Sequence, residues 1–153
     1  MKVFLDANVL FSASLSEYGA AQALLVAAHV AQAQCVSSDY AWGEALRNLA
    51  LKAPQGLARL GLIEALVARV SEPAAVHVEA AQRAGVVAKD APVLAAALQC
   101  GAAMFVTGDM RHFGHLFGQH IDGVLVLSLR AALDHLAGPA KSRRAARPRG
   151  IKP

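Results

Sequence analysis

Four acidic residues hold positions from which carboxylates can act together. Asp6 follows the short apolar run VFL, and Asp109 follows a second such run in AMFVTGD. Asp90 begins the stretch DAPVLAAALQCG, which precedes that second run, and Glu44 lies in SDYAWGEALRNL, where other charges are few. If these side chains met without a lysine or arginine between them, they would repel one another strongly. A divalent cation that prefers oxygen ligands, such as Mg²⁺ or Mn²⁺, would neutralise them.

Two polar residues accompany the acids that follow the apolar runs. Asn8, two positions after Asp6, can hold the loop by hydrogen bonds, and Thr107, two positions before Asp109, can orient the second loop. A bound divalent ion can activate water and stabilise a phosphoryl transition state. The sequence therefore predicts a metal-dependent catalytic site made of Asp6, Glu44, Asp90 and Asp109, in which the three aspartates are the metal ligands.

Each of these acids also has an ordinary structural explanation. Asp90 suits the N-cap of a helix by itself, and Asp6 and Asp109 suit turns that follow strands. Glu44 suits a solvated helix face. Taken singly, each acid fits the structural explanation better, whereas their joint placement favours a site.

Strands alternate with helices along the predicted order of elements. Short apolar runs predict strands over 2–5, 34–37, 103–106 and 124–128, with 75–78 as a weaker candidate. Helices are predicted over 18–32, 39–52 with Ser38 as its N-cap, 57–69, the stretch from Asp90 to Gly101, and 129–137. This order predicts an α/β fold, a three-layer α/β/α sandwich with a mainly parallel sheet. Asp6 and Asp109 would then share the sheet edge where ligands bind.

The positive net charge of the chain belongs to its C-terminal end. Of the 15 lysine and arginine residues, six lie in residues 141–153, which hold none of the 11 acids. We expect a folded domain over 1–138 and a basic, disordered tail over 139–153. Such tails often touch nucleic acid, and a solvated terminus explains the composition equally well.

The remaining composition indicates a cytoplasmic protein with no membrane partner. No apolar run approaches the roughly 20 residues that span a bilayer, and Asp6 interrupts the apolar stretch that a signal peptide would need. Cys35 and Cys100 lie far apart and fit no C-x-x-C pattern, so buried thiols are expected.

The chain resembles the PIN-domain ribonucleases, and especially the VapC-like toxins of bacterial toxin–antitoxin pairs. The matching stretches are VFLDANVLFSA, SDYAWGEALRNL, KDAPVLAAALQCGAAMFVTGDMRHF and VLVLS, which together span about residues 2–128. The resemblance implies an α/β/α sandwich, an acidic Mg²⁺ or Mn²⁺ site and endonucleolytic cleavage of RNA. The positions that match the family's acids are Asp6, Glu44, Asp90 and Asp109, and those that match its accessory polar residues are Asn8 and Thr107.

The resemblance also implies partners, and the chain departs from the family pattern in places. RNA is the implied substrate and a small antitoxin protein the implied partner, while a homodimer stays open. Lys89 puts a cation beside Asp90. Only one acid follows Thr107, which makes a second metal ion less assured. The basic tail also lies outside the family pattern.

Arg111 and His112 are expected to contact a substrate phosphate or to face solvent. The H-x-x-H spacing of His112 and His115 could suggest zinc, but no cysteine or paired motif completes a tetrahedral set.

Two other functions compete with the ribonuclease. A phosphotransfer enzyme of the haloacid dehalogenase type also places an aspartate after a strand, but it needs a second acid where Asn8 stands. A non-catalytic RNA-binding module conflicts with four acids, because acids repel RNA unless a metal bridges them.

Overall fold

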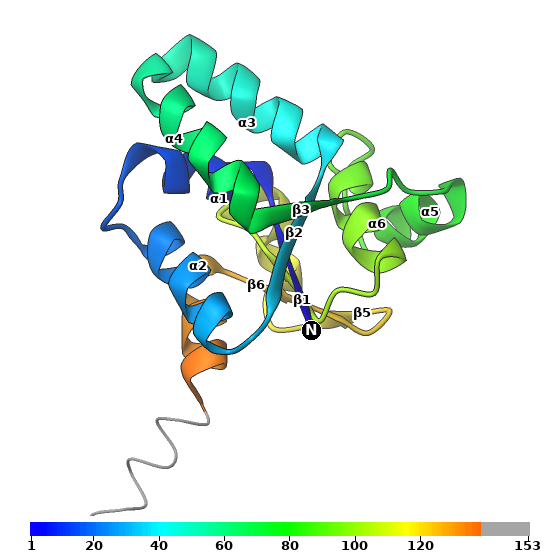
Figure 1. The fold of residues 1–153 in the computed structure, drawn as a ribbon. Helices are drawn as coiled ribbons and strands as arrows, with labels where there is room; N and C mark the ends of the chain where they lie inside the picture. Colours follow the sequence, from blue (N-terminus) through cyan, green and yellow to red (C-terminus); the bar gives the residue numbers. More distant parts are fainter. Residues whose placement is uncertain (139–153) are drawn as a thin grey trace, which may run out of the picture.

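The structure, a computed structural model, describes residues 1–138, and the predicted basic tail lies outside the described residues. The chain folds into three layers, with a central sheet covered by helices on both faces (Figure 1). The predicted α/β/α sandwich is therefore confirmed.

Within the described residues, the sheet has six strands in the order β3-β2-β1-β4-β6-β5. The bounds are β1 Lys2–Leu5, β2 Gln34–Ser38, β3 Val67–Val70, β4 Met104–Val106, β5 His120–Ile121 and β6 Val124–Leu127. All neighbouring pairs are parallel except β5 with β6. The chain runs outward from β1 to β3 and then returns to the far side of β1 as β4. The carboxyl ends of β1 and β4 therefore flank the point where the winding direction changes, which is where open α/β sheets bind ligands.

The helices divide between the two faces of the sheet. Four helices precede β3, namely α1 Ala7–Leu15, α2 Ala20–Val30, α3 Asp39–Lys52 and α4 Leu57–Ile63. Two helices, α5 Ala75–Arg83 and α6 Ala91–Gln99, connect β3 with β4 and lie on the opposite side of the sheet (Figure 1). The short helix α7 Met110–Phe113 follows β4, and a further helix covers residues 129–138. Short 3-10 turns occupy Pro54–Gly56, Glu64–Leu66 and Gly114–Leu116.

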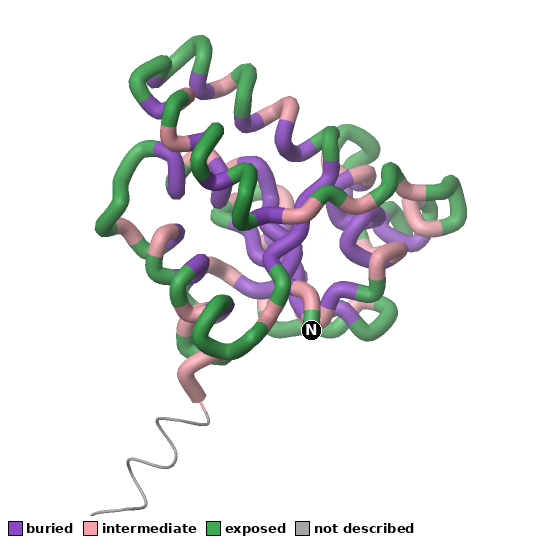
Figure 2. Tube along the Cα trace, viewed as in Figure 1, coloured by how far each residue is buried: buried purple, intermediate pink, exposed green. Residues whose placement is uncertain are grey.

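Buried residues gather along the strands and on the inner faces of the helices (Figure 2). Phe4 of β1 and Phe105 of β4 stack with ring centroids 5.7 Å apart, and Phe105 meets Phe113 at 5.1 Å. The alanines of α6 are fully buried, so this helix packs closely against its neighbours. The close packing fixes the start of α6, which carries Asp90.

Two sequence predictions about the elements are wrong, and α1 is among the elements that were not predicted. Residues 75–78 form the first part of α5 instead of a strand, because a short apolar run does not separate helix from strand. The predicted helix over 57–69 ends at Ile63, and Val67–Val70 form the strand β3, since pairing with β2 outweighs the helical periodicity there. Helix α1 is absent from the predicted elements, although Asp6 caps it.

Within residues 1–138, no single helix has the length and apolar composition needed to cross a membrane. The bent pair α1 and α2, which meet at 105°, passes that test only when the two helices are taken together.

Candidate active site

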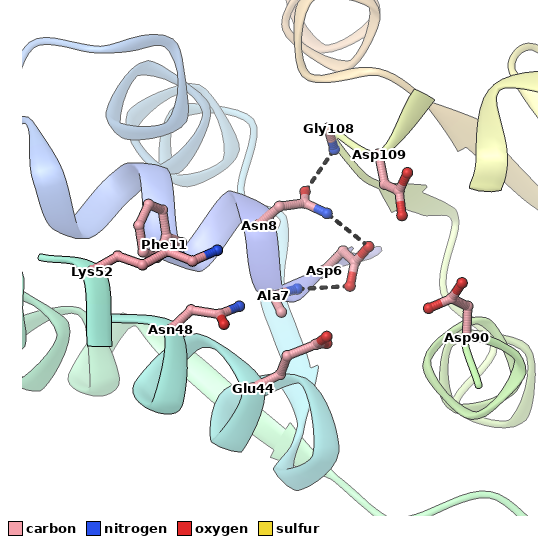
Figure 3. Close-up of a pocket in the computed structure, with 10 residues that line it drawn as sticks. All are labelled: Asp6, Ala7, Asn8, Phe11, Glu44, Asn48, Lys52, Asp90, Gly108 and Asp109. Carbon is pink, nitrogen blue, oxygen red and sulfur yellow. Dashed lines mark hydrogen bonds between the residues drawn. The ribbon is translucent and has the colours of Figure 1, made fainter. Parts of the chain in front are cut away.

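A cleft of about 360 Å³ opens at the carboxyl ends of β1 and β4. The side chains that line it include all four predicted acids, Asp6, Glu44, Asp90 and Asp109. They come from four separate elements, and Figure 3 shows their carboxylates pointing into one common space. The topology therefore brings together residues that are up to 103 positions apart in the chain.

Asp6 is buried at the end of β1, at 5% exposure, and both of its oxygens accept hydrogen bonds. Oδ1 accepts from the backbone N–H of Ala7 at 2.7 Å. Oδ2 accepts from the Thr107 hydroxyl at 2.8 Å and from Asn8 Nδ2 at 3.1 Å. Because the Asp6 N–H also donates to the Val106 carbonyl at 3.0 Å, this network joins the ends of the two central strands.

The electrostatics of Asp6 favour a cation beside it. Burial raises the pKa of Asp6 from its ordinary value of 3.8 to about 6, against the hydrogen bonds from Thr107, Ala7 and Asn8, which lower it. The charge of Glu44 acts in the same direction as burial, with a smaller effect, and is included in this value. A bound metal ion would relieve both of the effects that raise this pKa.

Asn8 and Gly108 bind the two strand-end loops to each other. The Gly108 N–H donates to Asn8 Oδ1 at 2.6 Å, while Asn8 Nδ2 also lies 3.2 Å from Thr107 Oγ1. A Cβ at position 108 would lie 3.3 Å from Asn8 Oδ1, so glycine permits this close approach.

Asp109 follows β4 and caps α7 by accepting from the His112 N–H at 3.0 Å. Its Oδ2 lies 2.8 Å from His112 Nδ1. Burial alone would raise the pKa of Asp109, but the hydrogen bonds from His112, together with the charge of that ring, outweigh burial and hold the pKa below its ordinary value. Asp109 is therefore ionised when the site is free of metal.

Asp90 stands at the N-cap position of α6, yet its side chain makes no capping hydrogen bond. Its Oδ2 is buried and lacks a hydrogen-bond partner among the described residues. The nearest basic group is the His112 ring, with Nδ1 at 3.5 Å. An unpartnered buried carboxylate oxygen is costly, so the explanation of Asp90 as an ordinary cap does not account for its geometry.

These residues fit a hard divalent ion. Ligand atoms of Asp90, Asp109 and His112 lie within 4.8 Å of one another. Two of the three aspartates predicted as metal ligands, Asp90 and Asp109, belong to this group, and His112 is an addition. The third predicted ligand, Asp6, is outside the group, and both of its oxygens accept hydrogen bonds. Asp90 Oδ2, which has no hydrogen-bond partner among residues 1–138, is an oxygen ligand that such an ion could use.

Two basic residues that are close to the acids in the sequence lie outside the cleft. Arg111 is exposed on α7 and Lys89 is exposed before α6, and neither lines the cleft. His112, predicted as a phosphate contact, instead lies against Asp109 and Asp90.

Five residues that line the cleft are missing from the predicted site, namely Ala7, Phe11, Asn48, Lys52 and Gly108. Asn48 and Lys52 follow Glu44 at intervals of four residues on α3, so the helical period was the signal that could have found them. Phe11 had no such signal, because α1 was not predicted.

A family model described as PIN domain matches residues 2–111. Among solved structures, the chain is similar to VapBC2 from Rickettsia felis bound to a DNA fragment from their promoter, at 14% identity and a TM-score of 0.63, covering 84% of this chain and 98% of that chain. It is also similar to PAE2754 from Pyrobaculum aerophilum, at 18% identity and a TM-score of 0.59, with coverage of 90% and 99%. FitAB bound to the IR36 DNA fragment gives 19% identity and a TM-score of 0.54, with coverage of 83% and 94%. Comparison with curated proteins gives no match.

The solved structures support the fold, and the family model carries the assignment. It covers more than two thirds of the chain and includes all four acids that line the cleft. The resemblance stated from the sequence is thereby confirmed, and this chain belongs to the PIN-domain family.

Proposed function

We propose that this protein is a metal-dependent endoribonuclease. The observation that carries the proposal is the convergence of Asp6, Glu44, Asp90 and Asp109 on one cleft, where the buried Asp90 Oδ2 accepts no hydrogen bond from any described residue. When bound, Mg²⁺ or Mn²⁺ supplies a Lewis acid for a phosphate oxygen and an activated water.

We assign different roles in the site to different residues of the chain. Asp90 and Asp109 present oxygens from two elements toward one point, and we assign them with Asp6 to metal binding. Thr107 and Asn8 hold Asp6 in position through their hydrogen bonds. Glu44 lines the same cleft and adds negative charge beside Asp6, and we assign to it the acceptance of a proton from the attacking water.

The test is cleavage of a circular RNA, which only an endonuclease can open. We expect cleavage with Mg²⁺ or Mn²⁺, none with EDTA, and none from the Asp109→Asn variant in any buffer. DNA of the same sequence and a small phosphate monoester serve as alternative substrates. Hydrolysis of the monoester alone would favour the haloacid dehalogenase alternative, and RNA binding without cleavage would favour a non-catalytic module.

We also propose a small antitoxin protein as partner, with this chain as the toxin. The resemblance is to VapC-like toxins, and VapBC2 and FitAB, whose folds are similar, were each determined bound to a DNA fragment. A second cavity of about 780 Å³ beside α2 includes the exposed side chains of Val26 and Leu66 in its lining. Exposed apolar surface of this kind is typical of protein interaction sites.

The partner is tested in cells. Induced expression of the chain alone should arrest growth, and co-expression of a small protein encoded beside it should relieve the arrest and co-purify with it. Arrest by the Asp109→Asn variant as well would show that the effect is independent of cleavage.

A further inference from the structure

The cleft has a second end that the four acids do not occupy. Phe11 of α1 and Asn48 and Lys52 of α3 line it, on the side away from Asp90 and Asp109 (Figure 3). On α3, Asn48 and Lys52 continue the face that begins with Glu44. Eight residues of α-helix extend about 12 Å, so α3 carries this face well beyond the acids.

The charge along the cleft changes sign at this end. Lys52 is the one cation among the described residues that line the cleft, and its side chain is exposed. It makes no ion pair within residues 1–138. A lysine ammonium binds phosphate as a compact point charge, whereas the four acids repel a polyanion. Lys52 is therefore the described residue of the cleft whose charge can attract a phosphate.

Phe11 adds an aromatic face to the same end. Its ring is half-buried, packed on one side against the core and bordering the cleft on the other. Unpaired RNA bases stack on aromatic side chains of this kind. The half-buried Asn48 amide, which lies between Phe11 and the acids in Figure 3, offers both a donor and an acceptor.

We infer that Phe11, Asn48 and Lys52 form a binding subsite for a nucleotide that flanks the scissile bond of single-stranded RNA. Lys52 binds a phosphate of this nucleotide and Phe11 stacks on its base. The inference rests on the proposed ribonuclease function and names how that same site holds its substrate.

Lys52 could instead have a purely structural role. It lies in the last turn of α3, where a cation interacts favourably with the helix dipole. Binding to RNA distinguishes the two roles. The probe is a labelled single-stranded RNA oligonucleotide, whose fluorescence anisotropy is followed with the full chain in EDTA, so that no cleavage occurs, over a series of salt concentrations.

Lys52→Ala should weaken binding about threefold at low salt and reduce the salt slope by about 0.7, the value for one phosphate contact with a single strand. The matched control is Arg47→Ala, which removes a cation from the same helix but outside the cleft. It should leave the slope unchanged. Equal effects of the two variants, or no change of slope with Lys52→Ala, would overturn the inference.

Phe11→Leu keeps an apolar side chain but removes the aromatic face. It should weaken binding several-fold with an unchanged salt slope, whereas Phe117→Leu, at another half-buried position, should have no effect. Thermal melting shows whether Phe11→Leu still folds. If it does not, the result for Lys52→Ala alone tests the inferred subsite.

Single-turnover cleavage separates this inference from the proposed function. If the unmodified chain cleaves RNA and the Lys52→Ala variant binds and cleaves RNA equally well, the inferred subsite is wrong, but the proposed ribonuclease function is supported. If the unmodified chain neither binds nor cleaves RNA, both fall together. The expected result is a higher half-saturating protein concentration for Lys52→Ala, with a saturated rate within about twofold of the unmodified chain, since one lost phosphate contact weakens binding and leaves the four acids in place.

Discussion

The Thr107 hydroxyl donates a 2.8 Å hydrogen bond to the Asp6 carboxylate, across a separation of 101 residues in the sequence. The same hydroxyl oxygen lies 3.2 Å from Asn8 Nδ2 and accepts from the Asp109 N–H at 3.0 Å. One buried side chain thus contacts both loops that carry the strand-end acids. The geometry of the site depends on this hydroxyl.

Thr107→Val removes the hydroxyl and keeps the shape of the side chain. Because the hydrogen bond from Thr107 lowers the pKa of Asp6, the variant should raise that pKa further and weaken Mn²⁺ binding near pH 6. We also expect a loss of about 1–3 kcal/mol of stability, since Asn8 and Asp109 lose an acceptor in a buried site. Calorimetric Mn²⁺ titration and chemical unfolding measure the two effects. Thr107→Ser, which restores the hydroxyl, should recover most of both, and failure to do so would assign them to packing.

The raised pKa of Asp6 predicts how the stability of the metal-free protein depends on pH. The folded state binds this proton up to about pH 6, and the unfolded state only up to its ordinary pKa of 3.8. The stabilisation from protonated Asp6 is therefore complete below about pH 4 and is lost as the pH rises through 6. A shift of this size corresponds to about 2–3 kcal/mol.

Chemical unfolding in EDTA between pH 4 and 7 measures this, and Asp6→Asn provides the reference. The hydrogen bonds that asparagine cannot replace cost the same at every pH, so they cancel in the slope. The unmodified protein should lose stability relative to Asp6→Asn as the pH rises. A constant difference between the two would mean that Asp6 ionises with its ordinary pKa.

Asp109→Asn should abolish metal binding while the fold stays intact. Asparagine can still cap α7, and the lost contact with the half-exposed His112 is worth little. In EDTA the melting temperature should therefore stay close to that of the unmodified chain. Mn²⁺ should raise the melting temperature of the unmodified chain by mass action, but not that of the variant. Glu79→Gln, an exposed acid of α5 outside the cleft, is the control that should still respond to Mn²⁺.

The sequence predicted the acids of the cleft because each stands at a recognisable boundary. Asp6 and Asp109 follow buried strands, and the parallel order of these strands places both at one edge. The helix over 39–52 was predicted with the bounds that α3 has, and Ser38 caps it by accepting from the Ala41 N–H at 3.2 Å. The sequence predicted an element correctly where its capping residue and the spacing of its apolar residues indicated the same bounds.

Long-range pairing determined what the sequence could not predict. Val67–Val70 become a strand only because β2 offers a partner edge, and this pairing lies outside any local window. The position of His112 between Asp109 and Asp90 depends on how β4 and α6 pack, which no spacing encodes. The unpartnered oxygen of Asp90 is likewise a property of the folded site, since the sequence alone suggests an ordinary cap.

Glu44→Gln tests whether the acid on α3 belongs to the site. Its charge raises the pKa of Asp6, so removing it should move that pKa back toward 3.8. The stability decline of the metal-free protein should then occur at a lower pH than in the unmodified chain. Cleavage should fall by about 10²–10⁴-fold, the usual contribution of a group that accepts a proton in the reaction.

The two readouts for Glu44→Gln separate charge from structure. A variant that only perturbed packing would lose stability at every pH without moving the midpoint of the decline. Asn48→Ala, one turn further along α3, removes a neighbouring polar group without changing the charge, so it should leave that midpoint in place. Should Glu44→Gln keep both full cleavage and the original midpoint, Glu44 would lie outside the functional site, and the three aspartates alone would have to account for the chemistry.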